Sequence, residues 1–279
     1  MKKASMISLV SLLAGAAALV LRILQNDREF DGLSGLPIAG GVYGPALLAL
    51  FGIAALVLCG LVFVIPRDTG DGPAFLDVFS TDEPAALTLP ITGTLLLGLS
   101  GAADVATGLG VWGQSAQTIS EAGLVPVLIG TGDSFSKTAH LVLGVLSLAS
   151  AATLFMVTVA CRRKEDRTLD STLLLMTPLA LVIRLVLAYR AHSVNPSLAV
   201  YYVELLALVL LTLAFYRLSS FGFRAGRSRL FCLYAALAVL FSLPALADAA
   251  HLATTLLYLG CSLTLTGFLL LYRKEIPAA

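Results

Sequence analysis

The sequence predicts an all-α protein, a polytopic transmembrane helical bundle with about eight spans. Three observations predict it: 58% of the 279 residues are hydrophobic, only 13% are charged, and the mean hydropathy is +0.93. A soluble domain has charged residues at about 25% of its positions, so a fold in water would leave this apolar surface unburied. The net charge of +1 argues against a nucleic-acid-binding protein, which needs a basic face.

Eight segments are long and apolar enough to cross the hydrocarbon core, which takes about 20 residues of helix. In order they are 4–24, 43–65, 86–106, 138–161, 171–190, 198–217, 230–249 and 251–272. Almost no sequence separates the last two, which predicts a tight helical hairpin. A signal peptide is the alternative for the first segment, because Lys2 and Lys3 precede it and 14–16 resembles a cleavage site. The apolar run continues to Leu24, which favours a retained span.

The distribution of basic residues predicts that both termini are cytoplasmic. In this orientation thirteen of the eighteen basic residues lie on the inner side, namely Lys2, Lys3, Arg67, Arg162, Arg163, Lys164, Arg167, Arg217, Arg224, Arg227, Arg229, Arg273 and Lys274. Arg22, Arg28, Lys137 and Arg190 lie on the outer side, and Arg184 lies within a span. This bias follows the positive-inside rule, and an even number of spans satisfies it at both ends of the chain.

Two of the longer connections differ in composition. The inner connection 66–85 is acidic and rich in Gly and Pro, which predicts a solvated connector. The outer connection 107–137 is Gly-rich and weakly apolar. A plain loop is the simpler interpretation of the outer connection, and a re-entrant or interfacial segment is the alternative.

Short matches in the same order predict an internal duplication. They pair Ala18–Arg22 with Ala180–Arg184, Val42–Leu50 with Val200–Leu208, Gly101–Asp104 with Ala245–Asp248, and Ala139–Leu141 with Ala250–Leu252. We therefore expect a four-span repeat over 1–165 and a second over 166–279, integrated into one membrane domain. Four spans per repeat insert both halves the same way up, which makes the repeat parallel. Glu204 departs from the pattern, because it matches Ala46.

The ionisable residues within the spans gather in the outer half of the bilayer. Arg184 and Glu204 each lie six residues from the outer end of their segments, which is about 9 Å below the boundary at 1.5 Å per residue. Opposite charges at matched depth on neighbouring helices predict an ion pair. Such a pair either fixes helix packing or forms a substrate or proton site. The candidates for ligand binding or ion pairing are Arg184, Glu204, Asp104, Asp248, His140, His251, Tyr201, Tyr202 and Arg22.

Two Asp/His sets, related by the repeat, lie at the outer ends of their segments. Asp104 and His140 form one set, and Asp248 and His251 form the other. Proton transfer and metal binding both use such pairs, but Asp248 and His251 straddle a turn, where capping of the last helix is the simpler role. The sequence has no HExxH motif, and its four cysteines form no CxxC pair. We therefore predict no metal site, no cofactor and no catalytic residue.

Tyrosines and glycines add two further predictions. Tyr201 and Tyr202 lie near the outer boundary, which is typical of an aromatic belt, and beside Glu204 they are also candidates for lining a ligand pocket. Gly93 and Gly101 lie on a face of small residues, which favours close helix packing.

The stretch from Arg184 to Arg224 resembles an uncharacterised family of multi-span membrane proteins from low-GC Gram-positive gut bacteria. Asn195-Pro196, Tyr202, the Glu-Leu-Leu-Ala-Leu run from Glu204, and Phe215-Tyr216 carry this resemblance over about 40 residues. It implies a bacterial plasma membrane and no defined activity, and it assigns no functional residue.

Three functions remain open. The first is binding or transport of a small solute through a polar cavity in the outer half of the bundle. The second is a non-catalytic scaffold, sensor or accessory subunit, alone or in a homo- or hetero-oligomer. The third, least favoured, is an intramembrane enzyme that uses Asp, His and Glu. The lipid bilayer is the partner that all three share.

Overall fold

The computed structural model describes residues 3–30, 37–38, 40–65, 73–111, 133–163, 172–192, 198–249 and 251–272. Eight helices among these residues are long and apolar enough to cross a membrane. Apart from one isolated bridge between Phe30 and Pro37, the regular structure of the described residues is helical. The predicted fold class and the prediction of about eight spans are therefore confirmed.

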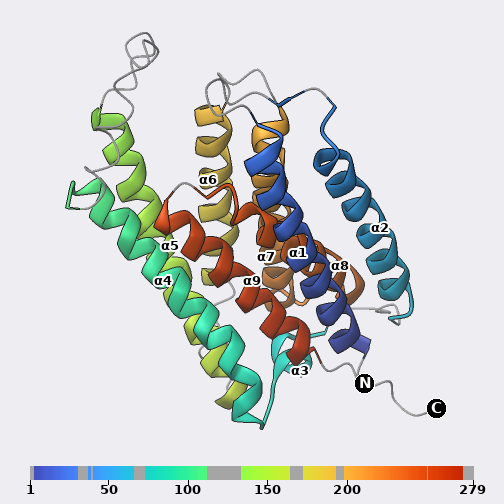
Figure 1. Ribbon diagram of the computed structural model, residues 1–279. Helices are drawn as coiled ribbons and strands as arrows, with labels where there is room; N and C mark the ends of the chain where they lie inside the picture. Colours follow the sequence, from blue (N-terminus) through green and yellow to red (C-terminus); the bar gives the residue numbers. More distant parts are fainter. Residues whose placement is uncertain are drawn as a thin grey trace.

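The helices follow one another in the order that the sequence predicts. They are α1 (Lys3–Arg28), α2 (Tyr43–Phe63), α3 (Phe75–Phe79), α4 (Thr88–Gly108), α5 (Asp133–Arg163), α6 (Met176–His192), α7 (Leu198–Gly222), α8 (Ser228–Ala245) and α9 (Leu252–Leu271). Short 3-10 helices precede α4 and α6, at Pro84–Leu87 and Leu173–Leu175. α1 begins and α9 ends at the same end of the bundle (Figure 1). We call this the predicted inner end, and the end where α1 and α6 finish the predicted outer end.

Small residues allow α4 to pack closely between α5 and α9. A Cβ atom on Gly101 would lie 2.9 Å from the carbonyl oxygen of Gly144 in α5. A Cβ atom on Gly93 would lie 2.7 Å from the carbonyl oxygen of Gly260 in α9. Real Cβ atoms do not approach so closely, so the backbones themselves are in contact, as in other membrane helix pairs. The close packing predicted for Gly93 and Gly101 is therefore confirmed.

α2 lies at the edge of the bundle, against α1 and α8 (Figure 1). One face buries Leu47, Phe51 and Leu58, whereas Leu56 and Phe63 on the opposite side are 75% and 69% exposed. A helix that is apolar on both faces has no stable place in water, because its outer face would remain wet. Lipid therefore covers the outer face of α2.

Of the connection 66–85, predicted to be solvated, the structure describes 73–85, and the part that forms α3 is buried, which corrects the prediction there. Phe75, Val78 and Phe79 of α3 are buried, and the Phe79 ring packs edge-on against Phe221 and Phe268. The spacing of the three apolar residues, i, i+3 and i+4, is that of one helix face. The surrounding acidic residues and Gly-Pro content concealed this short signal.

Several predictions concern residues outside the described ranges. These residues are the outer segment 112–132, the turn 164–171, the connection 193–197 that contains Asn195-Pro196, and the tail 273–279.

Candidate functional site

An ion pair between α4 and α6 lies at the centre of the polar layer near the predicted outer end. The Nη2 atom of Arg184 donates a hydrogen bond to Oδ2 of Asp104. Both side chains are buried, with 8% of Arg184 and 1% of Asp104 exposed. Burial of one charge in a membrane helix is costly unless an opposite charge compensates it, so each residue depends on the other.

The predicted partner of Arg184 was Glu204, and this is wrong. Among the described residues, the salt bridge of Arg184 is with Asp104. Position along a helix determines the depth of a side chain but not the direction in which it points around the helix axis. α6 does pack against α7, which carries Glu204, but Arg184 faces α4, α5 and α9 instead.

Asp104 is also in contact with a histidine. Nδ1 of His140 lies 3.3 Å from Oδ1 of Asp104, and the His140 side chain is 27% exposed. The ring of His251 packs edge-on against that of His140, with centroids 6.3 Å apart. A carboxylate thus lies between a permanent cation and an imidazole that gains a charge when protonated. This arrangement is able to respond to a proton or to a charged solute.

Glu204 is next to a tyrosine that sequence reasoning missed. The hydroxyl of Tyr258 in α9 donates a hydrogen bond to Oε1 of Glu204 at 3.4 Å. Tyr258 is almost fully buried. Tyr258 lies near the outer start of the last span, at a depth similar to that of Glu204. This matched depth is the sequence feature that could have indicated the contact.

A second ion pair joins α1 to the segment after α8. Nε of Arg22 donates to both carboxylate oxygens of Asp248, at 2.9 and 3.0 Å. Its Nη1 donates to the side chain of Gln25 at 2.8 Å, and its Nη2 donates to the carbonyl of Val200 at 2.7 Å. Only 1% of Arg22 is exposed. All three nitrogens of this guanidinium therefore have acceptors.

The capping role predicted for Asp248 is also wrong. α8 ends at Ala245, and the Asp248 carboxylate accepts bonds from Arg22 and from the amide of Asn26 at 2.9 Å. His251 occupies the N-cap position of α9 without a side-chain capping bond. The long-range charge of Arg22 is a stronger partner for a carboxylate than a local backbone amide.

One of the two predicted tyrosines, Tyr202, lies beside this second ion pair, at the start of α7. The Arg22 guanidinium carbon lies 5.7 Å from the centre of the Tyr202 ring, which is a cation–π contact. Tyr201 is partly buried next to it. Of the sequence candidates, Arg22, Asp248 and Tyr202 form one cluster, whereas Arg184, Asp104, His140 and His251 form another.

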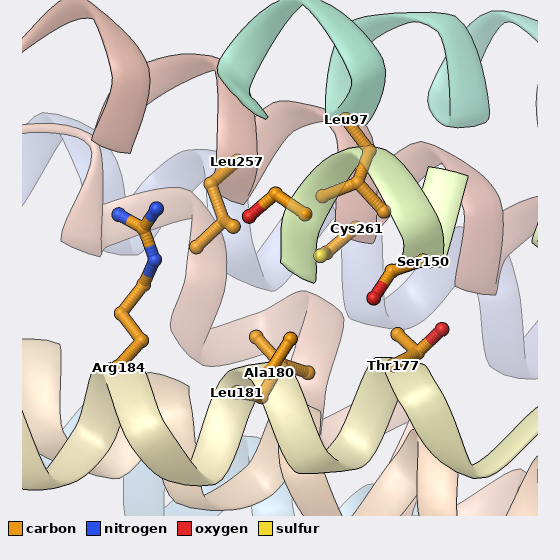
Figure 2. Close-up of a pocket in the computed structure, with 9 residues that line it drawn as sticks. Leu97, Ser150, Thr177, Ala180, Leu181, Arg184, Leu257 and Cys261 are labelled. Atoms are coloured by element: carbon orange, nitrogen blue, oxygen red, sulfur yellow. The ribbon is translucent and has the colours of Figure 1, made fainter. Parts of the chain in front are cut away.

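A small cavity with a mostly apolar lining adjoins Arg184 (Figure 2). Its volume is about 10 Å³, and its polar lining includes Ser147, Ser150 and Thr177. Figure 2 shows Arg184 at one end and Ser150 and Thr177 at the other. The hydroxyl oxygen of Thr177 is buried and has no hydrogen-bond partner among the described residues. A space of this size holds about one water molecule, so it is too small for an organic solute.

A larger hollow lies on the surface between the end of α1 and the start of α2. It encloses about 490 Å³ and is lined in part by Arg28, Glu29 and Tyr43. The Glu29 carboxylate accepts the backbone N–H groups of Tyr43 and Gly44, which are free donors at the N-terminus of α2. The hollow is therefore built around a helix cap and includes none of the predicted candidates.

Within the described residues, no three His, Cys, Asp or Glu side chains come close enough to hold a metal ion. His251 lies against His140 of the first Asp/His set, but Asp248 pairs with Arg22, so the four Asp and His residues do not form one centre. Comparisons with protein-family models, curated proteins and solved structures found no match. The contacts within this chain therefore carry the functional argument.

Proposed function

We propose that this multi-pass membrane protein binds a small solute in the polar layer at its predicted outer end and transports it across the bilayer. The observation that carries the proposal is the buried Asp104, which contacts both Arg184 and His140. Ionisable groups inside membrane bundles commonly mark substrate or proton pathways. A buried ion pair in contact with an imidazole and next to a small cavity is suited to that role.

The ion pair acts as a closed gate in this proposal. The adjoining cavity, at about 10 Å³, has no room for a solute, so this conformation corresponds to the closed state. A charged solute competes for either Arg184 or Asp104, and protonation of His140 gives Asp104 an alternative cation. Both events weaken the link between α4 and α6 and bias the bundle toward an open state, because a ligand shifts the population of the state that it binds better.

The proposal includes a duplicated architecture, with repeats over 1–165 and 166–279. Each guanidinium contacts a carboxylate from the other half: Arg22 contacts Asp248, and Arg184 contacts Asp104. This reciprocal exchange supports a pseudo-twofold relation between the halves. The packing of the helices is less regular, since α4 lies along α9 whereas α8 lies along α1 and α7.

The proposed location is a bacterial plasma membrane, with both termini in the cytoplasm. The excess of basic residues on one side and the resemblance to proteins of Gram-positive gut bacteria support it. Modification of single cysteines in intact cells tests the orientation. Residue 162 should be protected from an impermeant thiol reagent, and residue 28 should react.

Transport by the purified protein in liposomes tests the function. We expect gradient-driven uptake of at least one solute from a broad panel, and at least a tenfold loss of rate in Asp104→Asn, which removes the charge opposite Arg184. Asp27→Asn is the matched control, because Asp27 is exposed at the end of α1. Absence of uptake for every solute, together with no thermal shift by any of them, contradicts the proposal.

A non-catalytic scaffold, sensor or accessory subunit is the second candidate. The exposed apolar face of α2 favours it, because a partner helix can replace lipid on such a face. Purification from the native membrane distinguishes the two functions. A stoichiometric partner subunit favours the scaffold, whereas a lone monomer with a defined solute excludes it.

A further inference from the structure

Arg217 has an unusual environment near the predicted inner end of α7. It is partly buried, and its Nε atom has no contact with solvent and no hydrogen-bond partner. Among the described residues, its guanidinium forms neither a hydrogen bond nor a salt bridge. A guanidinium has five N–H donors, and a buried donor without an acceptor is costly. The two Nη atoms are not among the buried atoms without a partner, so an acceptor from outside the chain can reach the guanidinium through them.

Two tyrosine rings hold this guanidinium in place. Its central carbon lies 5.7 Å from the centre of the Tyr216 ring and 5.8 Å from the centre of the Tyr234 ring. Tyr216 is the preceding residue of α7, and Tyr234 belongs to α8. Cation–π contacts orient the planar group and leave its edge free for hydrogen bonds.

Arg229, at the same end of the bundle, has hydrogen-bond acceptors within the fold. Its Nε and Nη2 atoms donate to the carbonyl oxygens of Ile65 and Phe63, at the C-terminus of α2. Among the described residues, no carbonyl group accepts a hydrogen bond from the Nε atom of Arg217. Its donors are therefore available to a ligand, whereas those of Arg229 are used within the fold.

The depth of Arg217 indicates what the ligand is. Arg217 lies five residues before the end of α7, and Tyr234 lies six residues after the start of α8. At 1.5 Å per residue, both are about 7 to 9 Å inside the helix ends. The headgroup region on each side of the hydrocarbon core is about 5 to 7 Å thick. With the helix ends at the water-facing surface of the headgroups, the backbone of Arg217 lies near the boundary between the headgroup region and the hydrocarbon core, and the end of its long side chain reaches the level of the phospholipid phosphates.

We propose that Arg217, Tyr216 and Tyr234 form a binding site for the phosphate of a membrane phospholipid. The guanidinium donates two parallel N–H bonds to the phosphate oxygens, which is its preferred geometry for this anion. The exposed Arg224 and Arg227 lie at the same end and add positive charge, so an anionic headgroup binds better than a zwitterionic one.

A lipid panel on the delipidated wild-type protein tests the site without any substitution. The probes are phosphatidylglycerol, phosphatidylcholine, a glucosyl diacylglycerol that lacks phosphate, and inorganic phosphate. Native mass spectrometry and thermal unfolding measure binding. We expect one tightly held phospholipid and a higher Tm with phosphatidylglycerol, a smaller shift with phosphatidylcholine, and no shift with the other two probes.

Substitutions then localise the site. Arg217→Gln should weaken phosphatidylglycerol binding at least about tenfold, and Arg217→Lys should weaken it less, because the charge remains but the fork is lost. Arg162→Gln is the matched control, since it removes the same charge from an exposed position near the end of α5, outside the proposed site, and should leave binding unchanged.

Three results overturn the proposal. One is equal binding of phosphatidylglycerol by the wild type and by Arg217→Gln. Another is equal stabilisation by the phosphate-free glycolipid, which would mean that the acyl chains alone are recognised. The third is full occupation by inorganic phosphate, which would assign the site to a soluble anion.

Discussion

Arg22 and Arg184 end similar sequence stretches, Ala-Leu-Val-Leu-Arg and Ala-Leu-Val-Ile-Arg, but the fold treats them differently. Arg22 is almost fully buried, and its three nitrogens bond to Asp248, Gln25 and the carbonyl of Val200. Arg184 has one carboxylate partner, Asp104, which also contacts His140. We call the first group the saturated cluster and the second the shared cluster.

The difference separates a structural role from a functional one. A buried polar network in which every donor has an acceptor is rigid. Removal of one member leaves the others without a partner and lowers the stability of the fold. In the shared cluster, a guanidinium and an imidazole contact one carboxylate, and a small cavity lies alongside. When a charge in the shared cluster changes, Asp104 has a second partner to which it can turn. The shared cluster is therefore the better candidate for a site that changes between two arrangements.

The largest expected effect is on the saturated cluster. Asp248→Ala leaves the buried Arg22 charge without its carboxylate and should lower the free energy of unfolding by about 3 to 5 kcal/mol. Asp104→Ala should cost less, because the partly exposed His140 side of that cluster admits water. Unfolding in mixed micelles measures both, with Asp27→Ala as the exposed control. Equal losses at the two positions would remove the distinction between the clusters.

The next effect concerns the packing that holds the shared cluster together. Gly101→Val places side-chain atoms where α4 meets the backbone of α5, and overpacking of this kind costs about 1 to 3 kcal/mol. It should also separate Asp104 from His140, which lie on these two helices. Gly60→Val is the control, since nothing lies within 4 Å of that position. A fully stable Gly101→Val protein would contradict the close approach of α4 and α5.

The spans and the polar layer were predictable from the sequence, whereas the partners within that layer were not. Apolar length determined the spans, and repeated polar residues identified Arg22, Arg184, Asp104 and Asp248 as one layer. The partners were not predictable, because a span defines the depth of a side chain but not the helix that it faces. Arg184 therefore contacts Asp104, 80 residues away in sequence, and not Glu204 on the next helix.

Two other features were not predicted from the sequence, each for a different reason. The buried part of α3 is only five residues long and lies in an acidic connection, so its apolar spacing was too short to outweigh the composition. The Tyr258 hydroxyl that bonds Glu204 belongs to a residue type that is common in spans, and only the three-dimensional arrangement shows its partner.

A smaller effect distinguishes the titratable member of the shared cluster. His140→Gln should change the free energy of unfolding by less than about 1 kcal/mol, because a partly exposed ion pair contributes little. Under the proposed function it should nevertheless change how solute binding or transport depends on pH. Both readouts are needed, and Lys137→Gln is the control on an exposed position of the same helix. An unchanged pH profile would assign His140 to the structure alone.

The smallest effect concerns the cavity beside Arg184. Thr177→Val removes the buried hydroxyl that has no partner among the described residues. The cavity has room for about one water molecule and has hydroxyl groups in its lining, so we expect this hydroxyl to bond to water and its loss to cost about 0.5 to 1.5 kcal/mol. Thr92→Val, at an exposed position of α4, should have no effect. A gain in stability for Thr177→Val would mean that the cavity is dry, because an unsatisfied hydroxyl is worse than a methyl group. The shared cluster would then be as closed to water as the saturated one, and the strongest physical contrast between them would disappear.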